Sequence, residues 1–476
     1  MQIILKGNNE EYAVRDIVRL FLPGCDFDFC EETENPTEYI LVSAEMINQE
    51  YEFYAEYMCN GKKYSHSLKR NDYSKNYIKR VLYELLCTVF DMKPPWGILT
   101  GIRPSKKVIE LWQEGHSKPE SAKILKDDYL VSHKKTILAI ETASYEKDVI
   151  DKMDKNSISI YVGIPFCPTR CSYCSFISQS IKFSQKLVEP YLEALKKEFH
   201  HTAELIKKLG YNIETIYIGG GTPTTLDSNG LYTLLDNINT TFDVSKIKEF
   251  TVEAGRPDTI DREKLRIIKD AGAERISINP QTMNEKTLNI IGRCHTPDDI
   301  IKKFTMAREE GFCHINTDLI AGLPGEDEKD FDYTLSEIEK LNPDSVTVHS
   351  LSLKKGAYLD RQYNCLNTHA SNTANNMIDM ACEKMYAMNK RPYYMYRQKN
   401  TAGNLENIGF CDAGKASLYN IYIMQEIQTI IAMGSGGSTK RIIGNRIERC
   451  FNVKEVSEYI NRIDEMIDRK YKLFEI

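Results

Sequence analysis

Three closely spaced cysteines point more directly to chemistry than any other residues of this chain. Cys167, Cys171 and Cys174 occur in IPFCPTRCSYCSF with the spacing C-x3-C-x2-C. Thiolates are the usual ligands of iron-sulfur clusters, and a cubane normally takes four of them. Three ligands on one loop would leave one iron open for a substrate or cofactor. Zinc is the rival metal, but structural zinc sites take four ligands, commonly from two C-x2-C pairs, and no second pair lies nearby. Cysteines without any ligand role are the remaining alternative.

The sequence predicts that parallel strands position this loop. Short apolar runs, each followed by a helical pattern, recur between residue 157 and about residue 389. They lie at 158–163, 214–218, 249–253, 275–279, 314–320 and 345–351. This alternation is typical of a parallel sheet covered by helices, with right-handed crossovers. Active sites of such folds are built at the C-terminal ends of the strands, and the cysteine loop follows the first run.

Two further motifs follow the second and third runs. The second run ends in GGGTPT, where glycines let the backbone approach a ligand closely and exposed N–H groups can hold an anion. A strand-to-helix turn is compatible with the same glycines. The third run ends at Glu253. A carboxylate at the end of an apolar strand needs a partner, and an ordinary surface ion pair is the alternative to a functional role.

The cysteine motif carries a resemblance. Tyr161, the IPFC run and the loop with Tyr173 before its last cysteine resemble the signature of radical S-adenosylmethionine (SAM) enzymes. More narrowly, IPFCPTRCSYCSF and GGGTPT resemble the oxygen-independent coproporphyrinogen III oxidase family. The resemblance implies an α/β fold with an incomplete (β/α)6 barrel, a [4Fe-4S] cluster on the three cysteines, and SAM bound to the open iron. It also implies that the reduced cluster cleaves SAM to a 5′-deoxyadenosyl radical.

The same resemblance assigns SAM contacts to residues that follow successive strands. Tyr161 and Tyr173 would belong to this cofactor site. Gly220, Gly221 and Thr222 would line the methionyl end of SAM, and Glu253 would contact it. The polar edges of SAM would be held by Gln281 in SINPQTM, Arg293 in IIGRCHT and Asp318 in INTDLIAGLPGE. His349, near the end of the sixth run, is either a hydrogen-bonded core residue or a neighbour of SAM.

Three segments narrow the resemblance to the HemZ-type coproporphyrinogen dehydrogenase-like subgroup. They are LTGIRPSK, KNTAGNLENIGF and IAMGSGGSTKR. Established coproporphyrinogen oxidases carry an extra cysteine two positions after the third ligand, where this chain has Phe176. The heme-chaperone relatives carry a C-terminal H-N-x-x-Y-W pattern, which does not occur here. GSGGSTK lacks the G-x4-G-K-[ST] spacing of a nucleotide-binding P-loop.

We predict three regions. They are an N-terminal α/β cap domain (1–150), the radical SAM partial barrel (151–389) and an α+β C-terminal region (390–476) that closes the substrate cavity. In the cap we expect helices at 10–22 and 74–90, a helix capped by Ser105, and helical structure over 118–147. In the C-terminal region we expect helices at 416–433 and 453–470 and a hairpin turning at Gly444-Asn445.

Composition limits the function classes. A chain of 476 residues with a formal charge of −6 is not expected to wrap nucleic acid. We expect no membrane span, since no apolar run approaches the roughly 20 residues required. Thirteen cysteines and no signal peptide favour a reducing cytoplasm over a disulfide framework.

The resemblance implies a radical SAM oxidoreductase of porphyrin and heme biosynthesis. It would convert two propionates of coproporphyrinogen III to vinyl groups, giving protoporphyrinogen IX. The expected partners are this tetrapyrrole and a reductant protein such as flavodoxin or ferredoxin, and Arg256, Arg293 and Arg397 are candidates to receive substrate carboxylates. The alternatives are a radical SAM enzyme acting on heme or another tetrapyrrole, including methyl transfer, and a heme-binding chaperone without turnover.

Overall fold

The computed structural model describes all residues except 32–36, 176–178, 353–358, 360–367, 399–403 and 445. Contacts divide the chain into two compact units. The first contains residues 1–143, 364–375 and 396–406, and the second contains residues 144–363, 376–395 and 407–476. The predicted three-part division stays a prediction.

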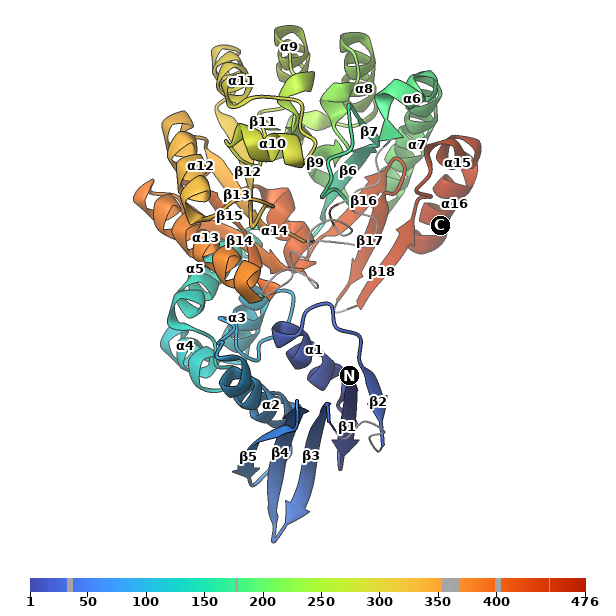
Figure 1. Ribbon diagram of the computed structural model, residues 1–476. Helices are drawn as coiled ribbons and strands as arrows, with labels where there is room; N and C mark the ends of the chain where they lie inside the picture. The colour runs from blue at the N-terminus through green and yellow to red at the C-terminus, as the bar shows by residue number, and fades with distance from the viewer. Residues whose placement is uncertain (32–36, 176–178, 353–358, 360–367, 399–403, 445) are drawn as a thin grey trace. The chain divides into compact units, whose positions relative to one another are not determined.

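The first unit is built on a five-stranded sheet in the order β2-β1-β3-β4-β5. The strands are β1 (Gln2–Lys6), β2 (Asp28–Cys30), β3 (Tyr39–Ile47), β4 (Glu50–Cys59) and β5 (Lys62–Arg70). The helices α1 (Glu11–Phe21) and α2 (Lys75–Phe90) supply apolar residues to the same core as β3 and β4. Figure 1 shows this sheet, together with α1 and α2, in blue. Ser74 caps α2 by accepting a hydrogen bond from the Asn76 N–H, as expected for serine at this position.

Two predictions in the first region are wrong in detail. Helix α3 (Pro104–Gln113) begins one residue before Ser105, which is buried inside the helix. Proline is favoured at the first helical position because its fixed φ suits the helix. Residues 118–147 form two helices, α4 (Lys118–Asp127) and α5 (His133–Ile150). The chain turns between them at Leu130, which has a φ of 58°.

The second unit contains the predicted parallel strands. They lie side by side in the order β13-β12-β11-β10-β9-β6, and every adjacent pair is parallel. The strands are β6 (Ser157–Ile164), β9 (Asn212–Gly220), β10 (Glu249–Glu253), β11 (Arg275–Ser277), β12 (His314–Ala321) and β13 (Ser345–Ser350). This arrangement confirms the incomplete (β/α)6 barrel.

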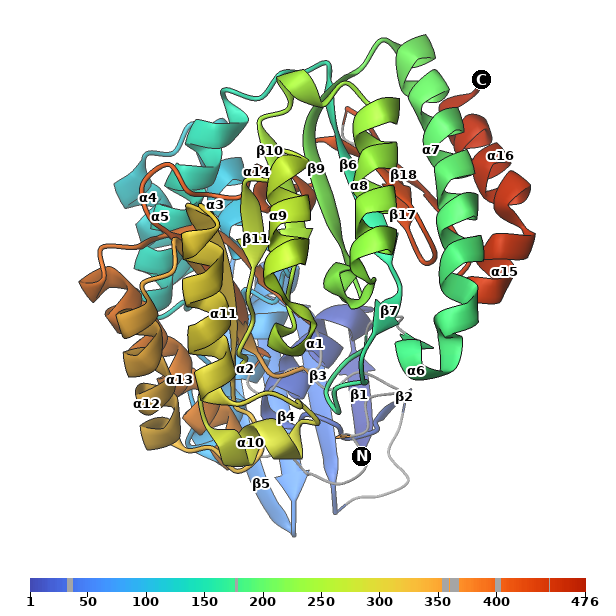
Figure 2. The same ribbon diagram turned by 90° about the horizontal axis from the view of Figure 1, so that it is seen from above.

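Helices connect the strands and cover one side of the sheet (Figures 1 and 2). They are α7 (Val188–Leu209), α8 (Ser228–Thr241), α9 (Arg262–Asp270), α10 (Glu285–Ile290), α11 (Pro297–Glu309) and α12 (Glu328–Leu341), followed by α13 (Thr368–Ala387). Side-chain caps begin several of them; Asp327, for example, accepts hydrogen bonds from the N–H groups of Lys329 and Asp330.

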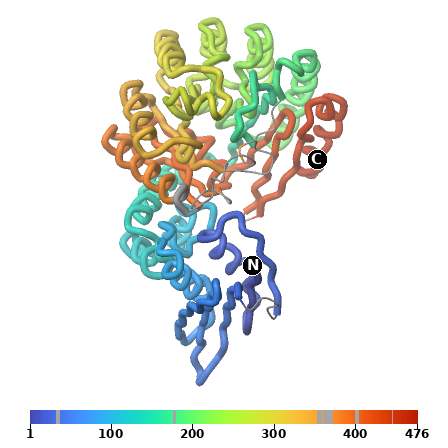
Figure 3. The backbone as a smooth tube through the Cα atoms, in the orientation of Figure 1, coloured from blue at the N-terminus to red at the C-terminus, as the bar shows by residue number. Residues whose placement is uncertain are grey.

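The C-terminal strands extend the barrel sheet at both edges. β15 (Glu406–Cys411) is antiparallel to β13, and β14 (Arg391–Arg397) lies beyond it. β16 (Thr429–Met433) is parallel to β6, so strands distant in sequence lie together (Figure 3). The antiparallel pair β17 (Ser438–Ile443) and β18 (Arg446–Phe451) follows. Asn445, in the predicted turn, lies outside the described residues.

The predicted helix 416–433 is wrong in its second half. Helix α14 (Leu418–Gln425) ends early, and residues 429–433 form β16. All five residues of this strand are buried, and a short continuous apolar run does not distinguish a buried strand from a buried helix. The predicted final helix is also divided, into α15 (Val456–Asn461) and α16 (Ile463–Phe474).

Candidate functional site

The cysteine loop begins directly after β6, at the C-terminal end of the first barrel strand. Cys167 lies in the short strand β7 (Phe166–Cys167), which pairs with β8 (Gln179–Ser180). Cys171 is buried, whereas Cys167 and Cys174 are half-buried. The loop backbone is anchored because the Ser172 N–H donates to the Ile291 carbonyl at 3.0 Å.

The thiol of Cys171 has a cationic neighbour. Nη1 of the buried Arg256 lies 3.6 Å from Sγ of Cys171. The guanidinium is held in place by two hydrogen bonds to the carboxylate of Asp258, at 2.8 and 2.9 Å. Arg256 therefore places a positive charge beside one of the three expected ligand sulfurs.

The glycine motif after β9 lies against the start of the cysteine loop. The Gly221 N–H donates to the Ile164 carbonyl at 2.7 Å, and the Thr222 N–H donates to the Phe166 carbonyl at 2.8 Å. A Cβ on Gly221 would lie 2.6 Å from the Phe166 oxygen, so only glycine fits there. Oγ1 of Thr222 is 3.5 Å from Sγ of Cys167.

Glu253 ends β10 beside this glycine motif. Its Oε1 accepts a 2.5 Å hydrogen bond from the hydroxyl of Tyr217. Burial raises the pKa of Glu253 to about 7, and the negative charge of Asp318 adds to this effect, although the Tyr217 hydrogen bond opposes it. The carboxyl therefore changes charge near neutral pH. A Cβ on Gly219 would lie 2.9 Å from this carboxyl, so the first glycine of GGGTPT makes room for it.

Three stacked tyrosines continue from this carboxyl. The rings of Tyr217 and Tyr419 are 4.5 Å apart between centroids and inclined by 20°. Tyr161 stacks with both at 6.3 Å. Burial raises the pKa of Tyr161, as it does those of Tyr217 and Tyr419, so these phenols stay neutral.

A second set of polar side chains lies where β11 ends and on the neighbouring strand β12. The amide of Asn279 donates to Oδ2 of Asp318 at 2.8 Å, and the Asn279 side-chain oxygen accepts from the Asp318 N–H. Nε2 of His349 lies 4.0 Å from the same carboxylate oxygen. Gln281 is also tied to this strand, since its N–H donates to the Asp318 carbonyl, and it adopts a φ of 70°. Non-glycine residues in this strained region are enriched at functional sites.

Arg293 connects these strand ends to the cysteine loop. Its Nη1 donates to the carbonyls of Gly255 and Asn279, and its Nη2 donates to the hydroxyl of Tyr173 at 3.0 Å. Burial raises the pKa of the Tyr173 phenol, which therefore stays protonated beside the guanidinium. Nε of Arg293 has no hydrogen-bond partner among the described residues.

Comparisons with known proteins agree with this geometry. The radical SAM superfamily model matches residues 161–338. The oxygen-independent coproporphyrinogen-III oxidase-like protein HemZ of Bacillus subtilis (strain 168) is 36% identical, with 100% of this chain and 98% of that protein aligned. The chain belongs to the HemZ-type group of the oxygen-independent coproporphyrinogen III oxidase family.

Other members of this family have different names. The heme chaperone HemW of Bacillus subtilis (strain 168) is 34% identical over 64% of this chain and 76% of its own. The oxygen-independent coproporphyrinogen III oxidase of Escherichia coli (strain K12) is 30% identical over 42% of this chain and 43% of its own. A solved structure of HemN from Escherichia coli, described as a radical SAM enzyme, superposes with a TM-score of 0.53 at 22% identity. It covers 69% of this chain and 73% of that one, and it supports the fold.

The radical SAM family carries a [4Fe-4S] cluster and SAM, and the residues around the loop fit this pair. Arg256 places a positive charge 3.6 Å from the sulfur of Cys171, and the tight approach at Gly221 leaves the glycine backbone beside the loop. Among the described residues, no three His, Cys, Asp or Glu side chains are grouped closely enough for one metal ion. In a cubane, however, each thiolate binds a different iron, so its sulfurs lie further apart. The ligand and SAM-contact residues stay predictions.

Three residues that contact the candidate site residues were not expected from the sequence. Tyr217, Tyr419 and Asn279 received no role, although Tyr217 and Asn279 each lie within a few residues of a recognised motif. Arg256 and Arg397 were expected to receive substrate carboxylates. Arg256 instead contacts Asp258 and the cysteine loop. Arg397, in the first unit, donates to the carbonyls of Leu99 and Asn404.

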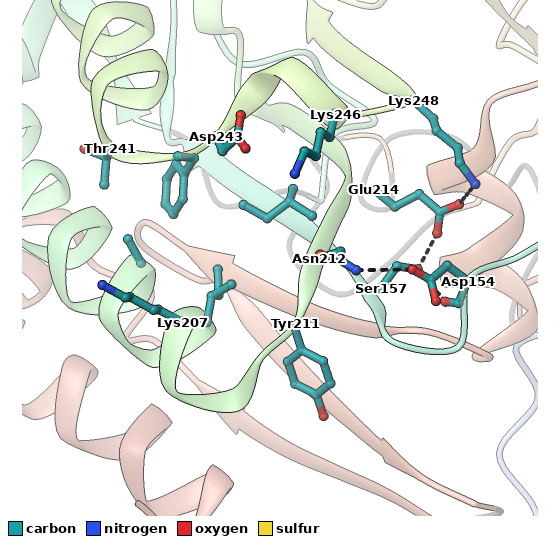
Figure 4. A pocket seen from close by; sticks show the side chains of 14 residues that line it. Asp154, Ser157, Lys207, Tyr211, Asn212, Glu214, Thr241, Asp243, Lys246 and Lys248 are labelled. Carbon is teal, nitrogen blue, oxygen red and sulfur yellow. Dashed lines mark hydrogen bonds and ion pairs between the residues drawn. The ribbon is translucent and has the colours of Figure 1, made fainter.

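A cavity of about 520 Å³ lies at the opposite ends of the strands (Figure 4). It is lined by Ser157 and Asn212, the first residues of β6 and β9, and by Glu214 and Lys248, which form an ion pair at 2.6 Å. The cysteine loop follows the other end of β6, so this cavity is not part of the candidate site.

Proposed function

We propose that this HemZ-type protein oxidatively decarboxylates coproporphyrinogen III to protoporphyrinogen IX by radical SAM chemistry. The observation that carries the proposal is the placement of Cys171, Glu253 and Asp318 near the C-terminal ends of β6, β10 and β12, which are parallel strands of one sheet, together with the Arg256 contact to Cys171. The three cysteines of the loop would hold the cluster, which together with SAM would supply the radical chemistry that starts the oxidation of the substrate.

The residues of the chain bind and orient these groups. Cys167, Cys171 and Cys174 hold the cluster, and Arg256 stabilises the Cys171 thiolate. Glu253, with a pKa of about 7, accepts hydrogen bonds from SAM hydroxyls when it is ionised. Asn279 fixes the carboxylate of Asp318, so that this group meets SAM in one orientation.

The remaining residues shape the SAM site. The backbone of Gly220 and Gly221 lies beside the methionyl end of SAM, and Thr222 lies between this backbone and Cys167. Arg293 donates a hydrogen bond to Tyr173 on the cysteine loop. The backbone hydrogen bonds of Gln281 hold this residue against β12. The stacked Tyr161 contributes an apolar wall that excludes water.

We also propose an electron donor and a cellular compartment for the protein. The protein would receive electrons from a flavodoxin or ferredoxin and work in the cytoplasm, where the cluster is protected from oxidation. None of the described helices is long and apolar enough to cross a bilayer.

A heme chaperone without turnover is the second candidate. The 34% identity with the heme chaperone HemW over 64% of this chain favours it. Anaerobic incubation with dithionite, SAM and coproporphyrinogen III separates the two functions. Protoporphyrinogen IX together with 5′-deoxyadenosine supports the decarboxylase. Stoichiometric heme binding without conversion of the porphyrinogen supports the chaperone.

A further inference from the structure

A short basic segment follows the strand that pairs with Cys167. β7 and β8 are parallel, and Cys167 is registered opposite Ser180. The hydroxyl of Ser180 donates to the Pro168 carbonyl at 3.1 Å, so this strand is held against the cysteine loop. Helix α6 (Ile181–Ser184) begins at the next residue. Figures 1 and 2 both show α6 beside β7.

Two lysines and one phenylalanine of this segment are exposed. Phe183 is 81% exposed, the highest value among the large apolar side chains described. Lys182 and Lys186 are both exposed, and Nζ of Lys182 lies 6.0 Å from the centre of the Phe183 ring. We call Lys182, Phe183 and Lys186 the α6 patch.

No acidic side chain among the described residues neutralises the two lysines of the α6 patch. Neither forms an ion pair with any residue in the described part of the chain. Residues 179–187 contain no acidic residue, although the whole chain has a formal charge of −6. The nearby acids are Glu189, which is exposed, and Glu455, which accepts a hydrogen bond from Gln179 and caps α15.

An exposed aromatic ring that is flanked in the sequence by two lysines suits an acidic protein partner. Aromatic side chains are common energetic centres of interfaces, and surrounding charges steer an oppositely charged partner and set the association rate. The position beside Cys167 matters because electron tunnelling weakens steeply with distance. A carrier bound at the α6 patch would lie next to the cysteine loop.

We propose that the α6 patch docks a small acidic one-electron carrier protein that reduces the cluster. This inference rests on the proposed function, because only a cluster that must be reduced needs such a donor. One electron leaves the carrier and enters the cluster, and no bond or proton is transferred. The recognition is electrostatic at Lys182 and Lys186 and apolar at Phe183.

The test compares a protein donor with a chemical one. The variant K182E/K186E reverses both charges, and F183S removes the exposed ring. Formation of 5′-deoxyadenosine from SAM is measured with an acidic flavodoxin as reductant and, separately, with dithionite. Flavodoxin binding is also measured by titration without SAM, which gives a readout that does not depend on turnover.

The matched control is K152E/K155E. Lys152 and Lys155 are exposed and precede β6, so they lie at the opposite end of that strand from the cysteine loop. The charge change is the same as in K182E/K186E, and any effect of net charge alone will appear in both proteins.

We expect K182E/K186E to weaken flavodoxin binding and to lower the flavodoxin-driven rate about tenfold at low salt, with a smaller effect at high salt. The dithionite-driven rate and the control should match the wild type. F183S should weaken binding without changing its salt dependence.

Unchanged flavodoxin binding by K182E/K186E and F183S overturns the docking proposal. Absence of dithionite-driven SAM cleavage in the wild type instead overturns the proposed function, and the binding titration still decides the docking.

Discussion

The hydroxyl of Tyr217 donates a 2.5 Å hydrogen bond to the carboxyl of Glu253, whose pKa is raised to about 7 by burial. This pair lies at the ends of β9 and β10, where the glycine motif meets the cysteine loop. The carboxyl can therefore gain or lose a proton near neutral pH.

The raised pKa of Glu253 predicts how stability depends on pH. Between pH 4.5 and about 7 the folded protein keeps a proton that the unfolded chain loses, so the free energy of unfolding falls as pH rises. The contribution of Glu253 to the free energy of unfolding is fully present below pH 4.5 and is lost as the pH rises through 7. This contribution amounts to roughly 3 kcal/mol. E253Q should remove this contribution and flatten the profile, as measured by denaturant unfolding between pH 5 and 8. Parallel profiles for E253Q and the wild type would contradict the raised pKa.

Arg256 should control the reduction potential of the cluster. R256M removes a positive charge and a hydrogen-bond donor 3.6 Å from the sulfur of Cys171. A hydrogen bond from a charged group contributes about 1.5–3 kcal/mol, which for one electron corresponds to a shift on the order of 60–130 mV. The potential should become more negative, because the reduced cluster carries more negative charge. Redox titration followed by electron paramagnetic resonance measures it, with R446M at an exposed arginine as the control. Equal potentials would rule out this role for Arg256.

Gly221 should not tolerate a side chain. The added Cβ of G221A would lie 2.6 Å from the carbonyl oxygen of Phe166 and 2.9 Å from that of Ile164. Overpacking of this kind costs about 1–3 kcal/mol, and it would displace the backbone that precedes Cys167. We expect lower thermal stability and less iron bound per chain. G101A, where an added Cβ meets nothing within 4 Å, should behave as the wild type. Normal iron content in G221A would refute the close approach.

Tyr173 should affect SAM binding through Arg293. Y173F removes the hydroxyl that accepts a 3.0 Å hydrogen bond from Nη2 of Arg293. Loss of one such bond costs about 1 kcal/mol, so the Kd for SAM should rise about fivefold. Equilibrium binding to the reconstituted protein gives this value. Y232F changes an exposed tyrosine on α8 and serves as the control. A Kd for SAM that Y173F leaves unchanged would show that Arg293 does not act on SAM.

The sequence was sufficient to predict the barrel and the order of its motifs. The six apolar runs correspond to β6, β9, β10, β11, β12 and β13, because a strand buried on both faces leaves a continuous apolar run in the sequence. Glu253 could be located because a carboxylate at the end of an apolar run is conspicuous, whereas Asp318 was assigned through the family resemblance.

The partners of these residues could not be predicted in the same way. Tyr419 stacks on Tyr217 from a helix about two hundred positions later, a contact that only the folded sheet creates. The sequence does not distinguish β16 from a helix, because its continuous buried apolar residues show neither the periodicity of a strand nor that of a helix. Arg256 was recognised as a cation, but its bond to Asp258 and its contact with Cys171 depend on the path of the loop. Phe176, which distinguishes the loop from that of established oxidases, lies outside the described residues.

The proposed decarboxylation is tested most sharply by product mass spectrometry after anaerobic incubation of the reconstituted protein with dithionite, SAM and coproporphyrinogen III. We expect 5′-deoxyadenosine and a tetrapyrrole lighter by two carbon dioxide molecules and four hydrogen atoms, with both products lost in C167S, C171S and C174S. Full recovery of unchanged coproporphyrinogen III, with no 5′-deoxyadenosine formed by a protein that carries its cluster, would rule out this activity.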